Sequence, residues 1–231
     1  MSPATLLADN LRRIMERIER ARERVTQPVT VIGVSKRQPD LLVREALELG
    51  VRNFGENYVQ ELVRRRSLFP EATWHLIGHL QTNKAKQAVQ ANLIHTIDGD
   101  RAAAALARHI DPGQPMSILI QVNTSGEESK SGCSEQELEP LIQRLLAMPV
   151  FRVRGLMCVP TRGASRGEYA RLRELRDAIE RSLACALPEL SMGMSADFED
   201  AILEGATMVR LGTILFGARP DRTDPGPAAT G

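Results

Sequence analysis

Eight short apolar runs, rich in β-branched residues, alternate along this chain with longer stretches whose apolar residues recur at helical spacing. Runs of this length are typical of buried strands, and repeated strand–helix units are typical of parallel strands joined by right-handed crossovers. The pattern therefore predicts an α/β fold with an all-parallel sheet. The predicted strands are residues 29–34, 51–55, 74–78, 93–97, 117–122, 152–159, 189–192 and 206–210.

The length of the chain favours one closed barrel. Eight units would take roughly 24 residues each, and a (β/α)8 barrel typically uses about 250 residues, close to the 231 present. A doubly wound open sheet would instead carry a glycine-rich nucleotide-binding turn after the first strand, and residues 33–39, GVSKRQP, do not provide one. We predict a single (β/α)8 TIM-type barrel with an extra N-terminal helix over residues 1–219, followed by a disordered Pro-, Gly- and Ala-rich tail at 220–231.

Composition argues against several classes of partner. A net charge of +1 and an aromatic content of 3% disfavour capture of nucleic acid or of an anionic membrane surface. Cys133, Cys158 and Cys185 are an odd number without CxxC spacing, which is typical of a reducing compartment rather than of disulfides or a zinc site. His75 and His79 lie four apart with no third ligand in view, so no metal site is expected. Because no apolar run is long enough for a membrane helix or a signal peptide, we expect a cytoplasmic protein with a small partner.

Polar residues gather where the predicted strands end. Lys36 follows the first strand, Asn57 follows the second and His79 follows the third, while a polar loop at 123–132 follows the fifth. In a barrel, the C-terminal strand ends meet on one face, and that face carries the active site. Residues that follow or close the seventh and eighth strands complete this rim, namely Ser195, Arg210, Gly212 and Thr213.

The loops after the last two strands are where this fold commonly binds phosphate. Ser195 is a possible N-cap for the helix that follows it, with Asp197 and Glu199 in the first turn. Gly212 and Thr213 open a short helix whose free N–H groups and threonine hydroxyl suit a phosphate. Ordinary helix capping is the alternative reading for both Ser195 and Thr213.

Lys36 and Arg210 are the candidate reactive and charged groups. A lysine that emerges from an apolar strand is partly desolvated, which lowers the pKa of its amine and favours Schiff-base formation. The alternative is a surface lysine with a buried stem. A phosphate site across the same rim favours the first reading, with a phosphate-bearing aldehyde held at both ends. Arg210 would then lie near the ring, unless it forms a salt bridge within the barrel. Lys84, Lys86 and Lys130 are either a cationic rim or solvated charges.

Seven ordered motifs in this sequence resemble those of a known family. They are VIGVSK, FGENYVQE, WHLIGHLQTNKAK, ILIQVNTSGEESKSG, RGLMCVP, LSMGMSADFEDAI and GATMVRLGTILFGAR. The chain resembles the pyridoxal phosphate homeostasis protein family, of the YggS/PROSC type, from about residue 29 to 219. That family's fold resembles the N-terminal barrel of alanine racemase and lacks the second β-domain.

The resemblance implies a cofactor and a place for each residue. It implies pyridoxal 5′-phosphate bound as a Schiff base on Lys36, with Asn57 beside it. Arg210 would face the pyridine nitrogen, and Ser195, Gly212 and Thr213 would hold the phosphate. The implied function is intracellular pyridoxal phosphate (vitamin B6) homeostasis, with apo-enzymes that need the cofactor as recipients and a monomer or weak dimer as the assembly.

A pyridoxal-phosphate-dependent amino-acid racemase is the rival hypothesis. That chemistry needs a second acid–base group, which alanine racemase takes from another domain. The tyrosines here are Tyr58 and Tyr169, and Tyr169 falls on a predicted helix. An arginine rather than an acid at the ring nitrogen would also leave the ring a weaker electron sink. The sequence therefore favours a binding protein without catalytic activity.

Overall fold

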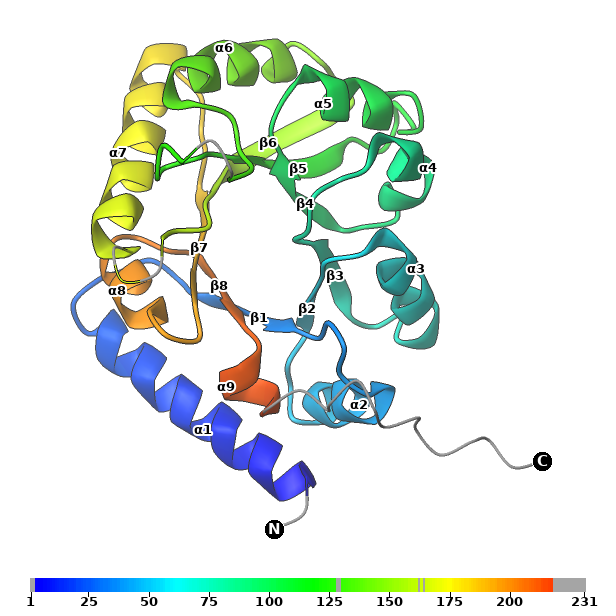
Figure 1. Cartoon of the computed structure of the whole chain (residues 1–231), viewed down its shortest axis with the longest axis vertical. Coiled ribbons are helices and arrows are strands. Elements are labelled where there is room, and N and C mark those ends of the chain that lie inside the picture. Colours follow the sequence, from blue (N-terminus) through cyan, green and yellow to red (C-terminus); the bar gives the residue numbers. More distant parts are fainter. Residues whose placement is uncertain (1–2, 128–129, 162, 164, 218–231) are drawn as a thin grey trace.

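A computed structural model of the chain describes residues 3–127, 130–161, 163 and 165–217. Within these residues, eight parallel strands form one closed barrel, in which each strand pairs with the next in sequence and β8 pairs with β1. Figure 1 shows the ring of strands with helices around its outside. The predicted (β/α)8 barrel is confirmed, whereas the predicted tail at 220–231 lies outside the described residues.

Each predicted strand is present within two residues of its expected bounds. The strands are β1 (Thr30–Val34), β2 (Asn53–Glu56), β3 (Thr73–Leu76), β4 (Leu93–Ile97), β5 (Met116–Gln121), β6 (Phe151–Met157), β7 (Glu189–Met194) and β8 (Met208–Leu211). Since each strand alternates its side chains between the two faces of the sheet, inward positions line the barrel and outward positions meet the helices.

The helices cover the outside of the ring (Figure 1). They are α1 (Pro3–Arg22), α2 (Asp40–Glu48), α3 (Val59–Leu68), α4 (Ala85–Ala88), α5 (Asp100–Ala107), α6 (Glu135–Leu146), α7 (Ser165–Leu183), α8 (Phe198–Leu203), α9 (Thr213–Phe216) and the 3-10 helix η1 (Thr82–Lys84). The predicted N-terminal helix is α1, which packs against α2, α8 and α9 and buries Leu7, Ile14 and Ile18. Among the described residues, no helix combines the length and apolar character that a bilayer crossing requires.

The core has an outer and an inner part. The outer part lies between strands and helices and contains the largest buried side chains, among them Trp74 and Phe54. The inner part consists of inward residues from five different strands, Ile32, Leu93, Leu119, Met157 and Met208. These apolar residues fill only some of the inward positions, and polar side chains occupy others.

Strand β6 carries a glycine that the closure of the barrel requires. The register of β5 against β6 shifts between Ile118 and Leu119, and Gly155 follows this irregularity with φ of 155°. A Cβ atom at Gly155 would lie 1.8 Å from the backbone oxygen of Glu189 in β7. Glycine therefore permits the close approach of β6 and β7, and Arg210 of β8 contacts Ser191 in β7 and Cys158 directly after β6.

Candidate functional site

The six predicted site residues come from four consecutive strands of the ring. The closed order places β7, β8, β1 and β2 side by side, so the loops after these strands share one sector of the C-terminal face. A Cβ atom at Gly212 would lie 3.6 Å from Cβ of Val34, the last residue of β1. The loop after β8 therefore begins beside the turn that carries Lys36. The barrel closure brings together segments that are about 180 residues apart in the sequence.

Ser195 is not the N-cap that the sequence predicts. Helix α8 begins at Phe198 with Asp197 at its N-cap, and the Asp197 carboxylate accepts a hydrogen bond of 2.8 Å from the backbone N–H of Met194. The Ser195 hydroxyl instead lies 3.5 Å from the backbone nitrogen of Ile214, which donates to it. The capping prediction was wrong, because Asp197 is closer to the true start of the helix. The hydroxyl of Ser195 points to the first turn of α9.

The predicted short helix after β8 is confirmed as α9. Gly212 stands at its N-cap and Thr213 is its first residue, with the Thr213 side chain exposed. The N–H groups of Leu215 and Phe216 both donate to the carbonyl of Gly212, at 3.0 and 2.9 Å. The earliest N–H groups of a helix have no acceptor within that helix. Ser195 and the start of α9 thus present hydroxyl and N–H donors together.

Lys36 lies half-buried in the turn between β1 and α2, and a charged clamp holds that turn. The clamp consists of Ser35, Gln38, Glu56 and Arg65. Arg65 donates to the backbone oxygens of Ser35, at 2.6 Å, and of Gln38. It also pairs with the Glu56 carboxylate, which accepts a further hydrogen bond of 2.6 Å from the Ser35 hydroxyl. The backbone on both sides of Lys36 is therefore fixed by one buried guanidinium.

The clamp is charged and nearly inaccessible to water. Glu56 is 1% exposed and Arg65 is 3% exposed. Burial raises the pKa of Glu56, against the opposite effect of Arg65 and of the hydrogen bond from Ser35. The second carboxylate oxygen of Glu56 is buried and has no hydrogen-bond partner among the described residues. Removal of Arg65 would leave this carboxyl group without compensation.

Arg210 is buried inside the barrel, where it contacts oxygen atoms. Its Nη1 donates to the carbonyl and to the hydroxyl of Ser191, both at 2.7 Å, and its Nη2 donates to the carbonyl of Cys158 at 2.8 Å. Arg210 forms no salt bridge within the part of the chain that the structure describes, which contradicts the alternative reading of its role. Burial lowers the pKa of Arg210 from its ordinary value. These contacts use three of the five N–H groups of the guanidinium.

A buried polar chain extends from Ser191 across the barrel. It consists of Asn53, His75, His95 and Ser191, from β2, β3, β4 and β7. The Ser191 hydroxyl lies 2.9 Å from Nδ1 of His95, and Nε2 of His95 lies 2.9 Å from Nδ1 of His75. Nε2 of His75 then lies 3.1 Å from Oδ1 of Asn53. Sequence reasoning considered His75 only as a metal ligand, so it missed this chain.

Both histidines of the buried polar chain are poorly disposed to carry charge. Burial lowers the pKa of His75 to about 4. Burial lowers the pKa of His95 well below its ordinary value, and the charges of His75 and Arg210 act in the same direction. Burial also raises the pKa of the Cys158 thiol to about 12. His75, His95 and the Cys158 thiol are therefore neutral near pH 7.

Asn57 lies on the side of the site toward β3. It is half-buried, and its backbone oxygen would be 2.1 Å from a Cβ atom at Gly78, so the loops after β2 and β3 touch only because residue 78 is glycine. A hollow of about 220 Å³ between these loops is lined in part by Asn57, His79, Gln81 and Lys84. Among the described residues, no side-chain hydrogen bond joins Asn57 to Arg210 or to the clamp, so its place beside a cofactor stays a prediction.

The candidate cationic rim is dispersed. Lys130 contacts Glu127, at 2.9 Å, and the hydroxyl of Thr161, while Lys86 is exposed. His79 is exposed and its Nδ1 lies 3.7 Å from Asp98. Among the described residues, no three His, Cys, Asp or Glu side chains could share a metal ion, and all three cysteines are free thiols. Lys130 therefore belongs to a separate surface contact, while Lys84 lines the hollow beside Asn57.

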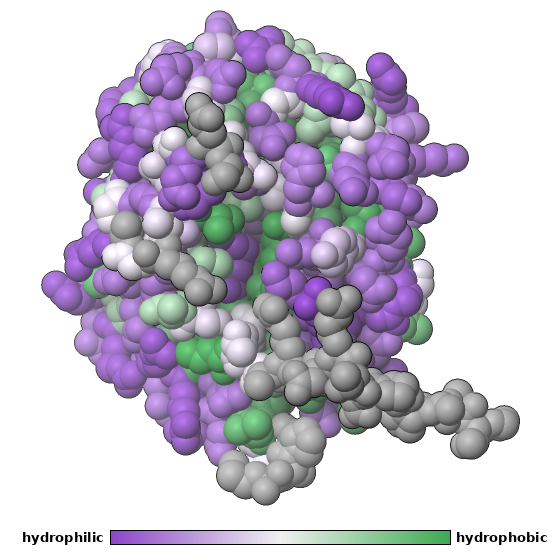
Figure 2. All heavy atoms as spheres, viewed as in Figure 1, coloured by the Kyte–Doolittle hydropathy of each residue, from purple (hydrophilic) through white to green (hydrophobic). Residues whose placement is uncertain are grey.

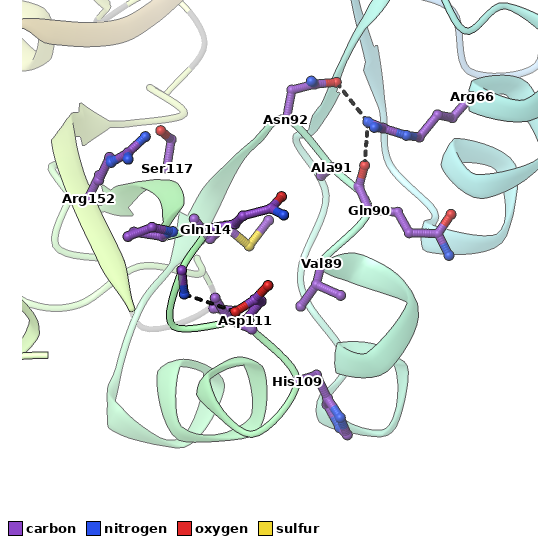
Figure 3. Close-up of a pocket in the computed structure, with 14 residues that line it drawn as sticks. Arg66, Val89, Gln90, Ala91, Asn92, His109, Asp111, Gln114, Ser117 and Arg152 are labelled. Atoms are coloured by element: carbon purple, nitrogen blue, oxygen red, sulfur yellow. Dashed lines mark hydrogen bonds between the residues drawn. The ribbon is translucent and has the colours of Figure 1, made fainter. Parts of the chain in front are cut away.

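Another cavity lies at the opposite end of the barrel. It measures about 590 Å³ and is lined by residues near the beginnings of β4, β5 and β6 (Figure 3). Arg66 projects toward it and donates to the backbone oxygen of Gln90, at 2.7 Å, and to the side chain of Asn92. In this fold the N-terminal strand ends serve stability rather than chemistry.

Hydrophilic side chains cover most of the face in Figure 2, and hydrophobic ones are visible toward the middle of the ring.

Comparison with known proteins agrees with this geometry. Residues 10–220 match the family model for the alanine racemase N-terminal domain. The chain is 41% identical to the pyridoxal phosphate homeostasis protein of Pseudomonas aeruginosa, over 92% of this chain and 96% of that protein. It is 40% identical to the protein of that name from Aquifex aeolicus, over 91% of this chain and 97% of the relative.

Solved structures give the same answer. PipY of Synechococcus elongatus PCC7942, determined with PLP bound, has a TM-score of 0.78 and 32% identity, covering 91% of this chain and 100% of PipY. Alanine racemase of Corynebacterium glutamicum has a TM-score of 0.73 at 18% identity, covering 95% of this chain and 62% of the racemase, and shows the shared fold alone. This chain belongs to the family of alanine racemase N-terminal-type barrels and, within it, to the pyridoxal phosphate homeostasis proteins. The predicted family is confirmed.

Proposed function

We propose that this protein binds pyridoxal 5′-phosphate through Lys36 and takes part in its intracellular homeostasis. The observation that carries the proposal is the convergence of the loops after β1, β7 and β8, which places an amine, a buried guanidinium and a group of hydroxyl and N–H donors in one sector. The relative PipY, determined with PLP bound, supports the same cofactor.

The residues present suit this cofactor, which when bound supplies an aldehyde and an electron-accepting pyridine ring. Lys36 would hold the cofactor, because its amine can form a Schiff base with that aldehyde. Ser195, Gly212 and Thr213 would hold the phosphate, because hydroxyl groups and early helical N–H groups are good donors to an anion. The clamp would keep the backbone of Lys36 in place.

Arg210 would face the ring nitrogen and Asn57 would lie beside the ring. A guanidinium cannot accept a proton, so the ring nitrogen opposite it would stay unprotonated and accept a hydrogen bond. Such a ring withdraws electrons weakly, which opposes chemistry that needs a carbanion. This arrangement favours retention and release of the cofactor over turnover of amino acids.

We further propose that the protein is not an enzyme in the usual sense. A racemase needs two positioned acid–base groups, and Lys36 can be only one of them. Tyr169 is fully buried on α7, and Tyr58 is 60% exposed beyond the end of β2. Cytoplasmic apo-enzymes would receive the cofactor, and the protein would act as a monomer or weak dimer.

The cofactor and its attachment are tested together by absorption and peptide mapping. The purified protein should absorb in the visible range, and borohydride should fix the cofactor to Lys36. Lys36→Ala should lose both signals while it keeps the fold. A label found only on Lys84, Lys86 or Lys130 would reject the site.

The phosphate contacts are tested by a double substitution. Ser195→Ala with Thr213→Val should weaken binding of pyridoxal 5′-phosphate by about ten-fold or more, because hydrogen bonds to a charged group contribute about 1.5–3 kcal/mol each. Titration of the apo-protein measures this. Unchanged affinity would place the phosphate elsewhere.

The absence of turnover is tested by exchange at Cα. The loaded protein, incubated with L- and D-amino acids in deuterated water, should show no rapid deuteration by NMR. Deuteration at ordinary enzymatic rates that Lys36→Ala abolishes would favour the racemase hypothesis.

A further inference from the structure

The interior of this barrel contains polar groups that binding of a cofactor at its rim does not by itself require. Small barrels of this type are usually filled by bulky branched side chains. Here His75 and His95 take inward positions and are 3% and 0% exposed. Buried polar groups destabilise a fold unless they are hydrogen-bonded, and a partly satisfied network is worse than an apolar core. The buried polar chain therefore calls for a physical reason.

The chain of hydrogen bonds has only one possible direction. The side-chain oxygen Oδ1 of Asn53 can only accept, so with both rings neutral each donor points from Ser191 toward Asn53, and the Ser191 hydroxyl, which accepts from Arg210, donates its own hydrogen to Nδ1 of His95. His95 then carries its proton on Nε2 and donates to Nδ1 of His75. His75 in turn carries its proton on Nε2 and donates to the side-chain oxygen Oδ1 of Asn53. Every link has one donor and one acceptor, and both rings are neutral.

Protonation of either ring would break this arrangement. An imidazolium donates from both nitrogens, so a charged His75 would place its Nδ1–H against the Nε2–H of His95, and a charged His95 would force the Ser191 hydroxyl to accept instead of donate. The lowered pKa values of both histidines agree with the neutral state. Since the orientation of each member fixes that of the next, the whole chain from Asn53 to Arg210 behaves as one unit.

We propose that His95 and Ser191 are positioning residues for the cofactor ring, because through the buried polar chain they fix the guanidinium whose charge faces the ring nitrogen. The inference rests on the proposed function, since it assumes that Arg210 lies at the ring. Arg210 is held by two carbonyls and one hydroxyl rather than by a carboxylate, so its charge is oriented without being neutralised. In this proposal the buried polar chain acts on the ring through Arg210.

The test is the substitution Ser191→Ala, which removes the link between Arg210 and His95. Pyridoxal 5′-phosphate should bind about three- to ten-fold more weakly, the equivalent of about one hydrogen bond. The pH at which the visible band of the bound cofactor converts should move by about 0.5 or more. Ser191→Thr, which keeps a hydroxyl, should restore both quantities. Ser117→Ala is the matched control, since Ser117 lies half-buried at the start of β5 and has no side-chain hydrogen bond within the described residues.

A second pair of variants keeps the proposal testable if Ser191→Ala does not fold. His95→Gln can accept from Ser191 and donate to His75, so it should retain the wild-type pH profile, whereas His95→Leu should shift it. A network that served packing alone would change thermal stability in these variants and leave the affinity and the pH profile as in the wild type. That result would overturn the proposal.

A reference variant separates this inference from the proposed function. Arg210→Lys should alter both affinity and pH profile if Arg210 lies at the ring. If Arg210→Lys has no effect, the assignment of Arg210 to the cofactor is wrong, and the positioning role falls with it. If Arg210→Lys has an effect and the disruptive variants at Ser191 and His95 have none, only the positioning role is wrong.

Discussion

The turn that carries Lys36 is held by a buried charged pair, whereas Arg210 is held by a chain of neutral groups. In the charged clamp, Arg65 and Glu56 are 3% and 1% exposed and contact each other directly. In the buried polar chain, Arg210 meets a hydroxyl and two carbonyls, and two neutral imidazoles follow. The clamp acts on backbone, and the chain acts on one side chain.

This difference shows which of the two arginine charges, that of Arg65 or that of Arg210, can act on a ligand. Glu56 neutralises Arg65, so the clamp restrains the Lys36 turn without placing an unbalanced charge beneath it. No carboxylate among the described residues pairs with Arg210, so its charge can act on a ligand. The two clusters also respond to pH with opposite sign. The raised pKa of Glu56 makes its burial less favourable as pH rises above 4.5, while the lowered pKa of His75 makes its burial less favourable as pH falls below 6.5.

The largest effect is expected from Arg65→Met. This substitution leaves the Glu56 carboxyl group buried without its cation, and breaking a buried pair from one side costs about 3–5 kcal/mol of the free energy of unfolding. Urea unfolding measures it. Arg144→Met is the control, because Arg144 pairs with Asp100 at 3.0 Å on the surface, whereas Asp40, the partner of Arg64, also contacts Arg65. Loss of such an exposed pair costs about 0–1 kcal/mol. Equal effects of the two variants would contradict the clamp.

A double substitution sharpens the same point. Glu56→Met combined with Arg65→Met removes both charges, and replacement of an entire buried pair by apolar residues is often close to neutral. We expect the double variant to be more stable than Arg65→Met alone. It should still bind pyridoxal 5′-phosphate less well than the wild type, because the carbonyls of Ser35 and Gln38 have lost their shared donor.

The next largest effect is the pH dependence that His75 contributes to the free energy of unfolding. Its pKa of about 4 lies below the ordinary 6.5, so below pH 6.5 the unfolded chain binds a proton that the folded chain does not. The free energy of unfolding should therefore decrease as pH falls from 6.5 to about 4, by about 3 kcal/mol from this residue. Asn53 and His95 contact the imidazole ring of His75, and Arg210 acts on this imidazole through Ser191.

Urea unfolding of the wild type and of His75→Gln at pH 7, 5.5 and 4.5 isolates this contribution. The stability difference between the two proteins should shrink as the pH falls, because glutamine does not titrate. His109→Gln is the control, since His109 is exposed. A difference that stays constant with pH would show that His75 is not buried in its neutral form.

The strands, the closed barrel and the rim could be predicted from the sequence, because each follows from a local pattern. The eight runs differ from the observed strands by two residues at most. The cap of α8 was wrong because Ser195 and Asp197 are both good N-caps, and two residues decide between them.

The burial of Arg65 in the clamp could have been predicted from the sequence. Arg65 stands within a run of three arginines, which resembles a solvated helix face. It also lies three residues after Leu62 and four before Phe69, both buried, so helical spacing places it on the apolar side. No local sequence pattern predicts the buried polar chain. Its members come from four separate strands, and the barrel register that brings His75 to His95 is not contained in either segment alone.

A smaller effect is expected from Ser35→Ala. The Ser35 hydroxyl donates to the Glu56 carboxylate at 2.6 Å, and a hydrogen bond to a charged group contributes about 1.5–3 kcal/mol to stability. Ser67→Ala on α3 is the control, since its exposed hydroxyl contacts only the Val63 carbonyl. The control should change stability by about 0.5 kcal/mol or less. If Ser35→Ala behaves like Ser67→Ala in urea unfolding, Glu56 does not depend on this donor.

The smallest expected effect is the response of the two arginine pairs to salt, and it tests the clamp most directly. The Debye length falls from about 10 Å at 0.1 M salt to about 3 Å at 1 M, but only for charges that water and ions can reach. The side chains of Arg144 and Asp100 are 52% and 65% exposed, whereas those of Arg65 and Glu56 are 3% and 1% exposed. Between 0.05 and 0.5 M sodium chloride, the loss of stability in Arg144→Met should therefore shrink by about 0.5 kcal/mol or less, toward zero. The loss in Arg65→Met should stay the same, because its origin is an uncompensated group in a medium that salt does not enter. If both losses shrink together in urea unfolding, water and ions reach the clamp, and its difference from a surface pair disappears.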